Sequence, residues 1–407
     1  MGNNLEESVI MSLSFSSQRM SEIPFAGIRK VFEKAAKIEA GGNEVIHFEI
    51  GRPDFDTPSH IKKAAAEALE NGFVHYTPNL GIMGLRKAIA QSVENYKSIK
   101  YDPSSEIMVV AGGQQAMYLS LQAFLEPDDE ILVPDPGYSQ FFSCIKLCGG
   151  VAVPVPLLEN ENFSMNFDMA EKLVTSRTRG IIINTPHNPT GSVLDQQQIE
   201  ELGRFAEKHD LVIFSDEAYD RIVYDKAKVY SPAAIPNLKK RTVIWGSLSK
   251  TYSMTGWRIG YLAAPAELIR SAVKIQQNLL LSICSFAQVG AIAALEGSQV
   301  CVDDMVSEFA SRREVILNGI KESPGLSCTN TPLGAFYVFV KHDTPLMNSE
   351  SLAEYLLDRF HVAMVPGSSF GKNGEGFLRL SYSASLEQCQ KGMELIIKGM
   401  TEIEKNR

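Results

Sequence analysis

The segment SLSKTYSMTGWRIG, residues 247–260, contains residue types that bind a phosphate and react with a carbonyl group. Lys250 supplies a primary amine, with the hydroxyls of Ser247 and Ser249 before it and the guanidinium of Arg258 after it. Hydroxyl and guanidinium groups donate hydrogen bonds to phosphate oxygens, and nearby glycines let the backbone approach a ligand. A lone lysine in such a turn would be a solvated loop residue. An amine beside a phosphate site instead indicates a phosphorylated carbonyl cofactor held as an imine, and pyridoxal 5'-phosphate fits.

Polar residues also follow other apolar runs that we predict to be strands. In an open parallel sheet, ligands bind beyond the carboxyl ends of the strands. These runs therefore predict one shared site at that edge of a sheet. Gly113 and Gln114 follow run 107–110, Tyr138 follows 130–133, Asn188 follows 180–183, Asp216 follows 211–214, and Ser247 and Lys250 follow 242–245.

Asp216 ends the apolar run LVIFSD. A buried carboxylate without a partner tends to become neutral, so this residue is expected to have a cationic partner. We expect that partner to be the protonated ring nitrogen of the cofactor, because this pairing keeps the ring able to accept electrons. The alternative is that Asp216 is a helix N-cap or an exposed loop acid.

The motif around Lys250 resembles the lysine signature of the fold-type I, pyridoxal-phosphate-dependent aminotransferases. The resemblance extends from about residue 12 to about residue 404 and is greatest to the bacterial and archaeal aspartate and aromatic aminotransferases. Lyases and synthases of the same fold share the motif. The resemblance implies that Asn188 and Tyr219 hydrogen-bond the phenolic oxygen of the cofactor and that Tyr138 stacks on its ring.

The phosphate is expected at the N-terminus of a helix that begins near Gly113, where free amides favour an anion. Gln114, Ser247 and Arg258 would complete this phosphate site. The resemblance adds Tyr76 from a neighbouring subunit, which implies a homodimer with shared active sites. It also implies that Arg379, in GFLRLSYS, holds the substrate α-carboxylate together with Gly51 and Asn188, although an arginine in an apolar strand can also be a structural ion pair.

The elements that must position these residues alternate between apolar runs and helical periodicity. This alternation predicts an α/β fold with a large domain built on a mostly parallel sheet, and a smaller α/β domain formed from both ends of the chain. We place the boundaries at 1–55, 56–295 and 296–407. Besides the runs above, we predict strands at 45–50, 151–155, 261–263, 336–340, 363–365 and 377–381, and helices at 28–37, 59–70 with Ser59 as cap, 113–125, 138–147, 168–174, 195–208, 266–281, 286–295, 302–321, 349–360 and 386–404.

Composition limits the remaining function classes. The 407 residues have a formal net charge of −9 and no basic tract, which argues against a nucleic-acid partner. The six cysteines are too scattered to predict a metal site. Polar residues interrupt the longest apolar stretches and the first fifteen residues do not match a signal peptide, so we expect no membrane partner and a cytoplasmic location.

These observations predict an aminotransferase that moves an amino group from an L-amino acid to a 2-oxo acid, with 2-oxoglutarate as the expected acceptor, by ping-pong kinetics. Lys250 would be the catalytic acid and base. A β-lyase or a cyclising synthase of the same fold is the alternative within this cofactor class. A cofactor-binding regulator without chemistry and a nicotinamide dehydrogenase are disfavoured, since there is little room for a DNA-binding module and no early G-x-G-x-x-G. Whether the donor is aspartate or an aromatic or neutral amino acid stays open.

Overall fold

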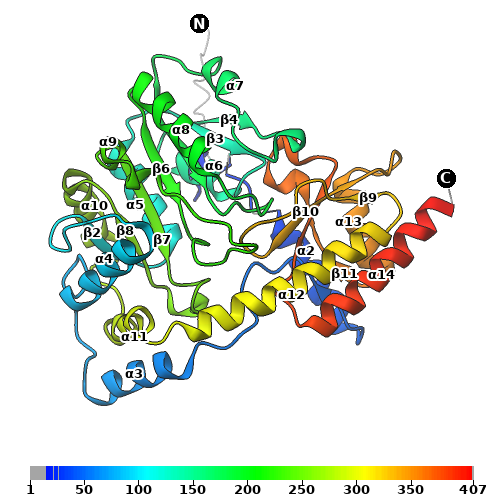
Figure 1. Cartoon of the computed structure of the whole chain (residues 1–407), viewed down its shortest axis with the longest axis horizontal. Coiled ribbons are helices and arrows are strands. Elements are labelled where there is room, and N and C mark those ends of the chain that lie inside the picture. The colour runs from blue at the N-terminus through cyan, green and yellow to red at the C-terminus, as the bar shows by residue number, and fades with distance from the viewer. Residues whose placement is uncertain (1–14, 22, 26, 406–407) are drawn as a thin grey trace, which may run out of the picture.

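A seven-stranded sheet forms the centre of the larger part of the molecule (Figure 1). This computed structural model describes residues 15–405 except 22 and 26. Strand β8 is antiparallel to both of its neighbours, and all other neighbouring pairs are parallel. This topology confirms the predicted α/β class with a mostly parallel sheet. The strands lie in the order β2 (Ile107–Val110), β8 (Gly260–Ala263), β7 (Thr242–Ser247), β6 (Val212–Asp216), β5 (Thr178–Asn184), β3 (Glu130–Asp135) and β4 (Val151–Pro156).

Helices cover both faces of this sheet, because successive strand residues point to opposite sides. On β2, Met108 and Val110 pack toward one group of helices, while Ile107 and Val109 pack toward another. Both sets are fully buried, which explains why the strands are continuous apolar runs. One face carries α5 (Gly113–Phe124), α6 (Gln140–Leu147) and α10 (Ala266–Leu279), and the other carries α4 (Met83–Lys97), α11 (Ser285–Glu296), α7 (Phe167–Glu171) and α8 (Gln196–Lys208), with α3 (Ser59–Glu70) packed on α11 and α9 (Pro236–Lys239) near α8.

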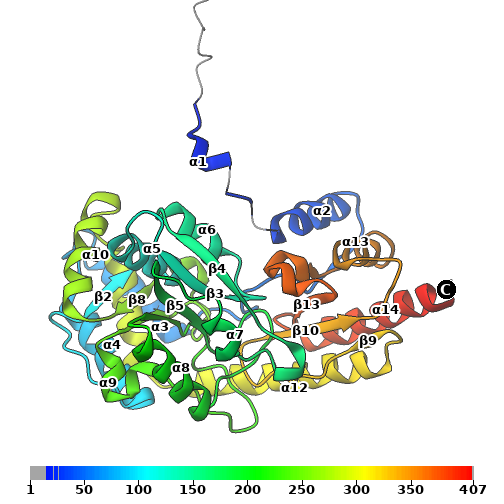
Figure 2. The same ribbon diagram turned by 90° about the horizontal axis from the view of Figure 1, so that it is seen from above.

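The smaller part is built on a four-stranded antiparallel sheet, and the long helix α12 (Val300–Glu322) runs along both parts (Figures 1 and 2). The N-terminal segment contributes to its core, where Ile46 and Phe48 pack with residues of the C-terminal helices. The division at 1–55, 56–295 and 296–407 remains our proposal. The strands are β12 (Val365–Pro366), β13 (Phe377–Ser381), β10 (Tyr337–His342) and β9 (Leu326–Ser327), and β1 (Ile46–His47) pairs separately with β11 (Val362–Ala363); the helices are α2 (Ile28–Ala40), α13 (Ser349–Phe360) and α14 (Leu386–Lys405).

Several predicted elements are confirmed at both ends, among them β2, β13, α3 and α13. A capping box begins α8, since the Asp195 side chain accepts from Gln198 N and the Gln198 side chain accepts from Asp195 N. Ser59 was wrong as the cap of α3, because Pro58 occupies the cap position and Ser59 is the first helical residue. Proline before a helix starts it through its restricted backbone, without a side-chain cap.

The predicted strand at 45–50 was wrong in length, because β1 is only Ile46–His47. The physical reason is a change of hydrogen-bonding partner. Phe48 N donates to Ala363 O, but Phe48 O accepts from Ser381 N, so the chain leaves β11 and crosses to β13. This crossing carries residues 49–51 into the space between the two parts.

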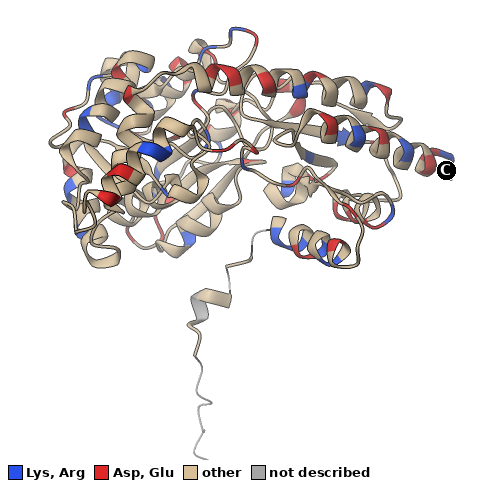
Figure 3. Ribbon diagram, turned by 90° about the horizontal axis from the view of Figure 1, so that it is seen from below, with Lys and Arg blue, Asp and Glu red and all other residues tan. Residues whose placement is uncertain are grey.

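The charged residues are interspersed along the surface helices (Figure 3). Acidic and basic side chains alternate along α12 and α14, where ion pairs such as Arg312 with Asp54 and Arg359 with Glu402 join neighbouring elements. No helix among the described residues is long and apolar enough to cross a membrane.

Candidate active site

A cavity of about 360 Å³ lies at the carboxyl ends of the parallel strands, between the two parts of the molecule. Its lining includes residues from both parts and from the crossing segment after β1. Tyr76 is the one predicted site residue that does not line it. The predicted residues that the structure brings together here are Gly51, Gly113, Gln114, Tyr138, Asn188, Asp216, Tyr219, Ser247, Lys250, Arg258 and Arg379.

Lys250 lies in the turn that follows β7, and its ammonium group hydrogen-bonds to the backbone oxygen of Gly51. The pKa of Lys250 is lowered to about 8, mainly by burial and also by the nearby positive charges of Arg379 and Arg258, while Asp216 opposes the change. An amine with this pKa is partly neutral near pH 8, which is the form that attacks a carbonyl carbon or accepts a proton.

Asp216 is the last residue of β6, and its Oδ1 accepts a hydrogen bond from Ala218 N at 3.1 Å. The pKa of Asp216 is raised to about 7, mainly by burial and also by the charge of Glu217, while the hydrogen bond from Ala218 N and the charge of Lys250 oppose the change. The N-cap alternative is wrong, because the next helix of the described chain begins only at Pro232. A buried carboxyl with a raised pKa is stabilised as an anion by a cationic partner, which a protonated ring nitrogen would be.

The N-terminus of α5 faces the guanidinium of Arg258. Gly112 precedes the helix with φ of 82°, and a Cβ atom there would lie 2.6 Å from Nη2 of Arg258. Arg258 itself has φ of 55° and donates from Nη1 to Thr255 O at 3.0 Å and from Nη2 to Ala111 O at 3.1 Å. The first N–H groups of a helix have no partner within the helix. Together with the guanidinium they form a cradle that fits a phosphate.

Arg379 lies on β13, and its side chain is only 3% exposed. Its Nη1 donates to Asn188 Oδ1 at 3.2 Å and its Nη2 donates to Glu49 O at 2.6 Å, while Nε is buried without a partner. Its guanidinium carbon lies 4.4 Å from the ring centroid of Tyr337. A buried guanidinium with one unsatisfied N–H is well suited to receive a carboxylate.

Gly51 allows the crossing segment to approach Tyr337 closely. A Cβ atom at Gly51 would lie 2.8 Å from the hydroxyl oxygen of Tyr337. The side chain of Asn184 links Asn188 to the end of β6. Its Oδ1 accepts from Asn188 N at 2.8 Å, and its Nδ2 donates to Asp216 O at 3.0 Å. Each predicted substrate residue therefore has a hydrogen bond that involves backbone: Arg379 with Glu49 O, Asn188 through its own N–H, and Gly51 through its own oxygen.

The hydroxyl groups of Tyr219 and Tyr337 lie 2.9 Å apart. Tyr138 donates to Gln114 Oε1 at 3.3 Å and packs edge-on against Phe141. Burial raises the pKa of Tyr138 to about 12 and raises the pKa of Tyr219 as well, so Tyr138 and Tyr219 both keep their hydroxyl protons at neutral pH. Tyr337 was missed from the sequence, where it stands in the strand-like run AFYVF. The strand-end rule does not detect a residue on an antiparallel strand.

Tyr76 lies outside the cavity and is 83% exposed. Its assignment to the phosphate of a neighbouring subunit remains a prediction. The apolar residues Phe15 and Phe25 do not line the cavity either, since they are 96% and 81% exposed, and Figure 2 shows α1 (Gln18–Ser21) apart from the body of the chain. Phe336 is buried in the core of the smaller part.

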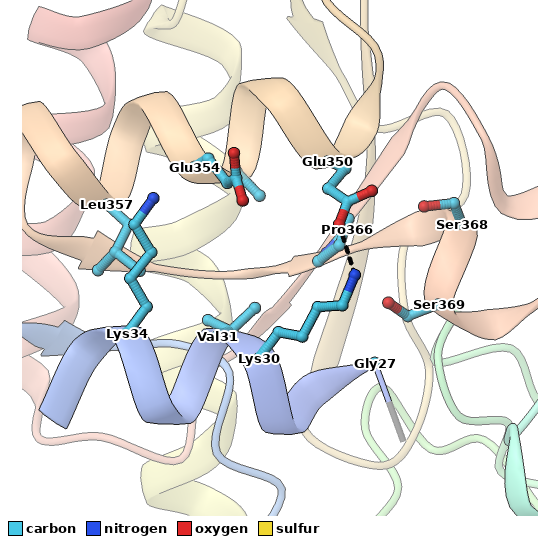
Figure 4. A pocket seen from close by; sticks show the side chains of 11 residues that line it. Gly27, Lys30, Val31, Lys34, Glu350, Glu354, Leu357, Pro366, Ser368 and Ser369 are labelled. Atoms are coloured by element: carbon cyan, nitrogen blue, oxygen red, sulfur yellow. Dashed lines mark hydrogen bonds and ion pairs between the residues drawn. The ribbon is translucent and has the colours of Figure 1, made fainter. Parts of the chain in front are cut away.

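A second hollow of about 230 Å³ lies between α2 and α13 (Figure 4). Lys30 reaches across it to Glu350, with 3.1 Å between Nζ and Oε1, and Lys34 pairs with Asp358 at 2.8 Å. These charges are paired and solvated, and the hollow contains none of the predicted site residues. Among residues 15–405 without 22 and 26, no group of three His, Cys, Asp or Glu side chains is arranged to hold a metal ion.

Comparisons with known proteins agree on one family. The family model described as aminotransferase class I and II matches residues 43–396. The chain is 41% identical to an aspartate aminotransferase of Pyrococcus abyssi and 39% identical to aromatic-amino-acid aminotransferase 2 of Thermococcus litoralis, each over 95% of this chain and 98% of the relative. Among solved structures, it is similar to an aspartate aminotransferase of Thermus thermophilus with maleate, with a TM-score of 0.90, 33% identity, and coverage of 95% of this chain and 100% of that one.

Proposed function

This chain belongs to the class I and II aminotransferases, and on that premise we propose that it transfers the amino group of an L-amino acid to 2-oxoglutarate in a ping-pong sequence. The family uses pyridoxal 5'-phosphate, and the residues around the cavity fit that group. The cradle at Gly112 and Arg258 suits its phosphate, and the carboxyl of Asp216 suits its ring nitrogen. When bound, this cofactor withdraws electrons and makes the Cα–H of an amino acid acidic.

The chain's own residues then have separate tasks. Arg379 binds the substrate α-carboxylate, with Asn188 and Gly51 beside it. Lys250, which has a lowered pKa, would hold the cofactor, and its free amine would take the proton from the substrate Cα as a base and deliver it to C4′ of the cofactor as an acid. Tyr219 and Asn188 hold the phenolic oxygen of the cofactor, and Tyr138 covers its ring.

The observation that carries this proposal is that Arg379, with its unpartnered Nε, lines the same cavity as the amine of Lys250. An amino acid and a 2-oxo acid both have an α-carboxylate, and a single buried guanidinium fork can bind only one of them at a time. This supports alternate binding of donor and acceptor at one site, which is the basis of ping-pong kinetics.

The cavity lining specifies the substrate side chain less closely than the α-carboxylate. The cationic residues of the described cavity lining are Lys250, Arg258 and Arg379, and the proposal uses all three for other tasks. The uncharged Gln114 and Gln140 and the apolar Met117 complete this wall. We therefore propose that aromatic or neutral amino acids are donors alongside aspartate, which is named for one similar protein.

The test is a panel of L-amino acids with purified holoenzyme. With 2-oxoglutarate present, varying both substrates should give parallel double-reciprocal lines. Without an acceptor, each donor should yield about one 2-oxo acid per site, whereas a β-lyase or a synthase would turn over many times. Continued turnover without an acceptor, or intersecting lines, would contradict the proposal.

Two variants test the residue assignments. Lys250→Ala should abolish turnover. Arg379→Lys should raise KM for every donor by roughly 10- to 100-fold, because an ammonium cannot replace two charge-assisted hydrogen bonds of the fork. The exposed Arg359→Lys is the matched control and should leave KM unchanged.

A further inference from the structure

A buried ion cluster lies directly behind the strand that carries Asp216. Lys97, the last residue of α4, has its Nζ 2.6 Å from Glu217 Oε2 and 2.6 Å from Asp220 Oδ2. The Lys97 side chain is 5% exposed and that of Glu217 is fully buried. None of these three residues lines the cavity that contains Lys250.

Both carboxylate oxygens of Glu217 have hydrogen-bond partners. Its Oε1 accepts from the hydroxyl of Ser215 at 2.8 Å and from that of Ser231 at 2.6 Å, while Oε2 faces Lys97. The backbone of Glu217 is also held, since its N–H donates to Trp245 O on β7 at 3.1 Å. Glu217 is therefore held in a fixed position, and its buried carboxylate is paired with the ammonium of Lys97.

The cluster holds both ends of the short segment that carries two proposed cofactor residues. Glu217 follows Asp216, and Asp220 follows Tyr219. Asp220 N donates to Glu217 O at 3.2 Å, which closes the turn between them. Because one ammonium binds the side chains at both ends of this turn, it fixes the backbone from which Asp216 and Tyr219 extend into the cavity.

The cluster also determines the charge next to Asp216. The segment contains three carboxyl groups within five residues, at 216, 217 and 220. Glu217 raises the pKa of Asp216, and Lys250 on the cavity side lowers it. On the other side, Glu217, Asp220 and the hydroxyl of Tyr261 face Lys97, and the buried Tyr101 interacts with both Lys97 and Glu217. Removing the ammonium would leave two uncompensated carboxylates in a region of low dielectric, close to Asp216.

A small cavity of about 30 Å³ adjoins the cluster and is lined by Lys97, Asp220, Tyr261 and Ser247. Ser247 also lines the large cavity, as part of the proposed phosphate site. The cluster therefore adjoins both ends of the cofactor site, the ring end through Asp216 and the phosphate end through Ser247.

We propose that Lys97 is a positioning residue for the cofactor site, which holds the turn of Asp216 and Tyr219 through Glu217 and Asp220 and keeps Asp216 ionised by balancing the charge of Glu217. This proposal rests on the pairing of Asp216 with the cofactor ring nitrogen that is part of the proposed function.

The test measures the dissociation constant of pyridoxal 5'-phosphate for full-length apoprotein from pH 6 to 9, by the fluorescence of Trp245 in the cavity wall. Lys97→Met should weaken binding by roughly tenfold near pH 7 and move the pH midpoint of binding upward, since about one pKa unit on Asp216 corresponds to a factor of ten. Glu217→Gln should move that midpoint downward. The double variant Lys97→Met/Glu217→Gln should return it toward the wild-type value.

Controls separate this role from structural support. Lys239→Met removes another partly buried lysine, which pairs with Glu106 at 3.0 Å, and should lower thermal stability without moving the pH midpoint. Lys97→Arg should keep the wild-type midpoint, because it keeps the charge. If Lys97→Met does not fold, Glu217→Gln still decides the matter, because it removes the buried carboxylate charge and leaves Lys97 paired with Asp220.

Two outcomes would overturn the proposal. One is a Lys97→Met protein with lower stability but an unchanged midpoint and affinity, and the other is a Glu217→Gln protein whose midpoint does not move. Asp216→Asn distinguishes these failures from failure of the proposed function. If Asp216→Asn weakens cofactor binding while Lys97→Met does not, only the role of Lys97 is wrong. If Asp216→Asn has no effect on cofactor binding, the pairing of Asp216 with the ring is wrong.

Discussion

At the residue scale, burial moves the pKa values of Lys250 and Asp216 toward each other. The pKa of Lys250 falls to about 8 and that of Asp216 rises to about 7, so both groups titrate near neutral pH in the protein without ligand. In both cases the larger cause is loss of water, and the other charged groups modify it. A ligand with an anionic phosphate and a cationic ring would provide the missing counter-charges, and the cavity is therefore most favourable electrostatically when such a ligand is bound.

The lowered pKa of Lys250 predicts how the apoprotein takes up pyridoxal 5'-phosphate. Covalent attachment requires the neutral amine, so the rate should rise with pH and level off above a midpoint near 8. Asp216→Asn should move this midpoint downward, because the carboxylate raises the pKa of Lys250. Stopped-flow absorbance after mixing apoprotein and cofactor between pH 6.5 and 9.5 measures the rate. A rate that still rises steeply at the alkaline end would show that the amine is not perturbed by its burial.

At the element scale, the sequence allowed the sheet and one edge of the site to be predicted. Strands such as β2 and β6 are apolar because both faces are covered, and polar residues follow them where the chain leaves the core. Residues that depend on contacts between distant segments were harder to predict. The strand at 45–50 was overextended because Phe48 bonds to two different strands, and Tyr337 was missed because it reaches the site from the antiparallel sheet.

The junction between β2 and α5 gives a prediction about the phosphate site. Gly112→Ala would strain the backbone at φ of 82° and place a Cβ atom 2.6 Å from Nη2 of Arg258. We expect the guanidinium to move and the dissociation constant of pyridoxal 5'-phosphate to rise by roughly tenfold or more, since a displaced charge-assisted hydrogen bond is worth about 1.5 to 3 kcal/mol. Equilibrium dialysis of the apoprotein measures this constant.

Gly149→Ala is the matched control for that substitution. Gly149 has a similar φ of 87°, but a Cβ atom there would have no neighbour within 4 Å. It should lower stability through backbone strain alone and leave cofactor affinity unchanged. Equal loss of affinity in both variants would show that strain, and not contact with Arg258, is the cause.

The contact between α2 and β1 predicts a pH-dependent stability. His47 Nδ1 lies 2.8 Å from Glu49 Oε1, and Nε2 lies 3.0 Å from Glu39 Oε1 on α2. The hydrogen bond to Glu49, with that to Glu39, raises the pKa of His47 to about 9 against the effect of burial. A raised pKa in the folded state stabilises the protein fully below the unfolded value of about 6.5, and this stabilisation is lost as pH rises through about 9.

His47→Gln should therefore destabilise the protein most at pH 6 and much less at pH 10. The expected difference is on the order of 1 to 2 kcal/mol, allowing for solvent screening of a partly exposed group. Thermal unfolding of both proteins across this range measures the difference. The exposed His75→Gln controls for loss of an imidazole, and a constant effect of His47→Gln at all pH values would contradict a charged bridge.

At the scale of the whole molecule, the phosphate site borders an apolar surface. A hollow of about 780 Å³ shares Arg258 with the main cavity and is lined by apolar residues such as Leu280, Ile283 and Phe286. Leu280, which lines it, and its neighbour Leu281 are exposed large hydrophobic residues, and so are Val74 and Tyr76. An apolar surface of this kind is typical of an interface with another subunit. It supports the predicted homodimer, in which Tyr76 would reach the partner's phosphate site.

Hybrid dimers test whether Tyr76 acts across the interface. Lys250→Ala and Tyr76→Ala subunits with different tags can be co-expressed and the hybrid isolated through both tags. If Tyr76 serves the partner, one site of the hybrid combines an intact Lys250 with an intact Tyr76, and activity and cofactor content should recover to about half of the wild-type values, as two-fold symmetry requires. Pairing a wild-type subunit with the double variant Lys250→Ala/Tyr76→Ala gives the opposite arrangement. One site then combines the intact Lys250 with the altered residue 76 and the other lacks Lys250, so this hybrid should have about half the low activity of the Tyr76→Ala parent. If the second hybrid is the active one, Tyr76 acts within its own subunit, because only then does the wild-type chain contain a complete site by itself.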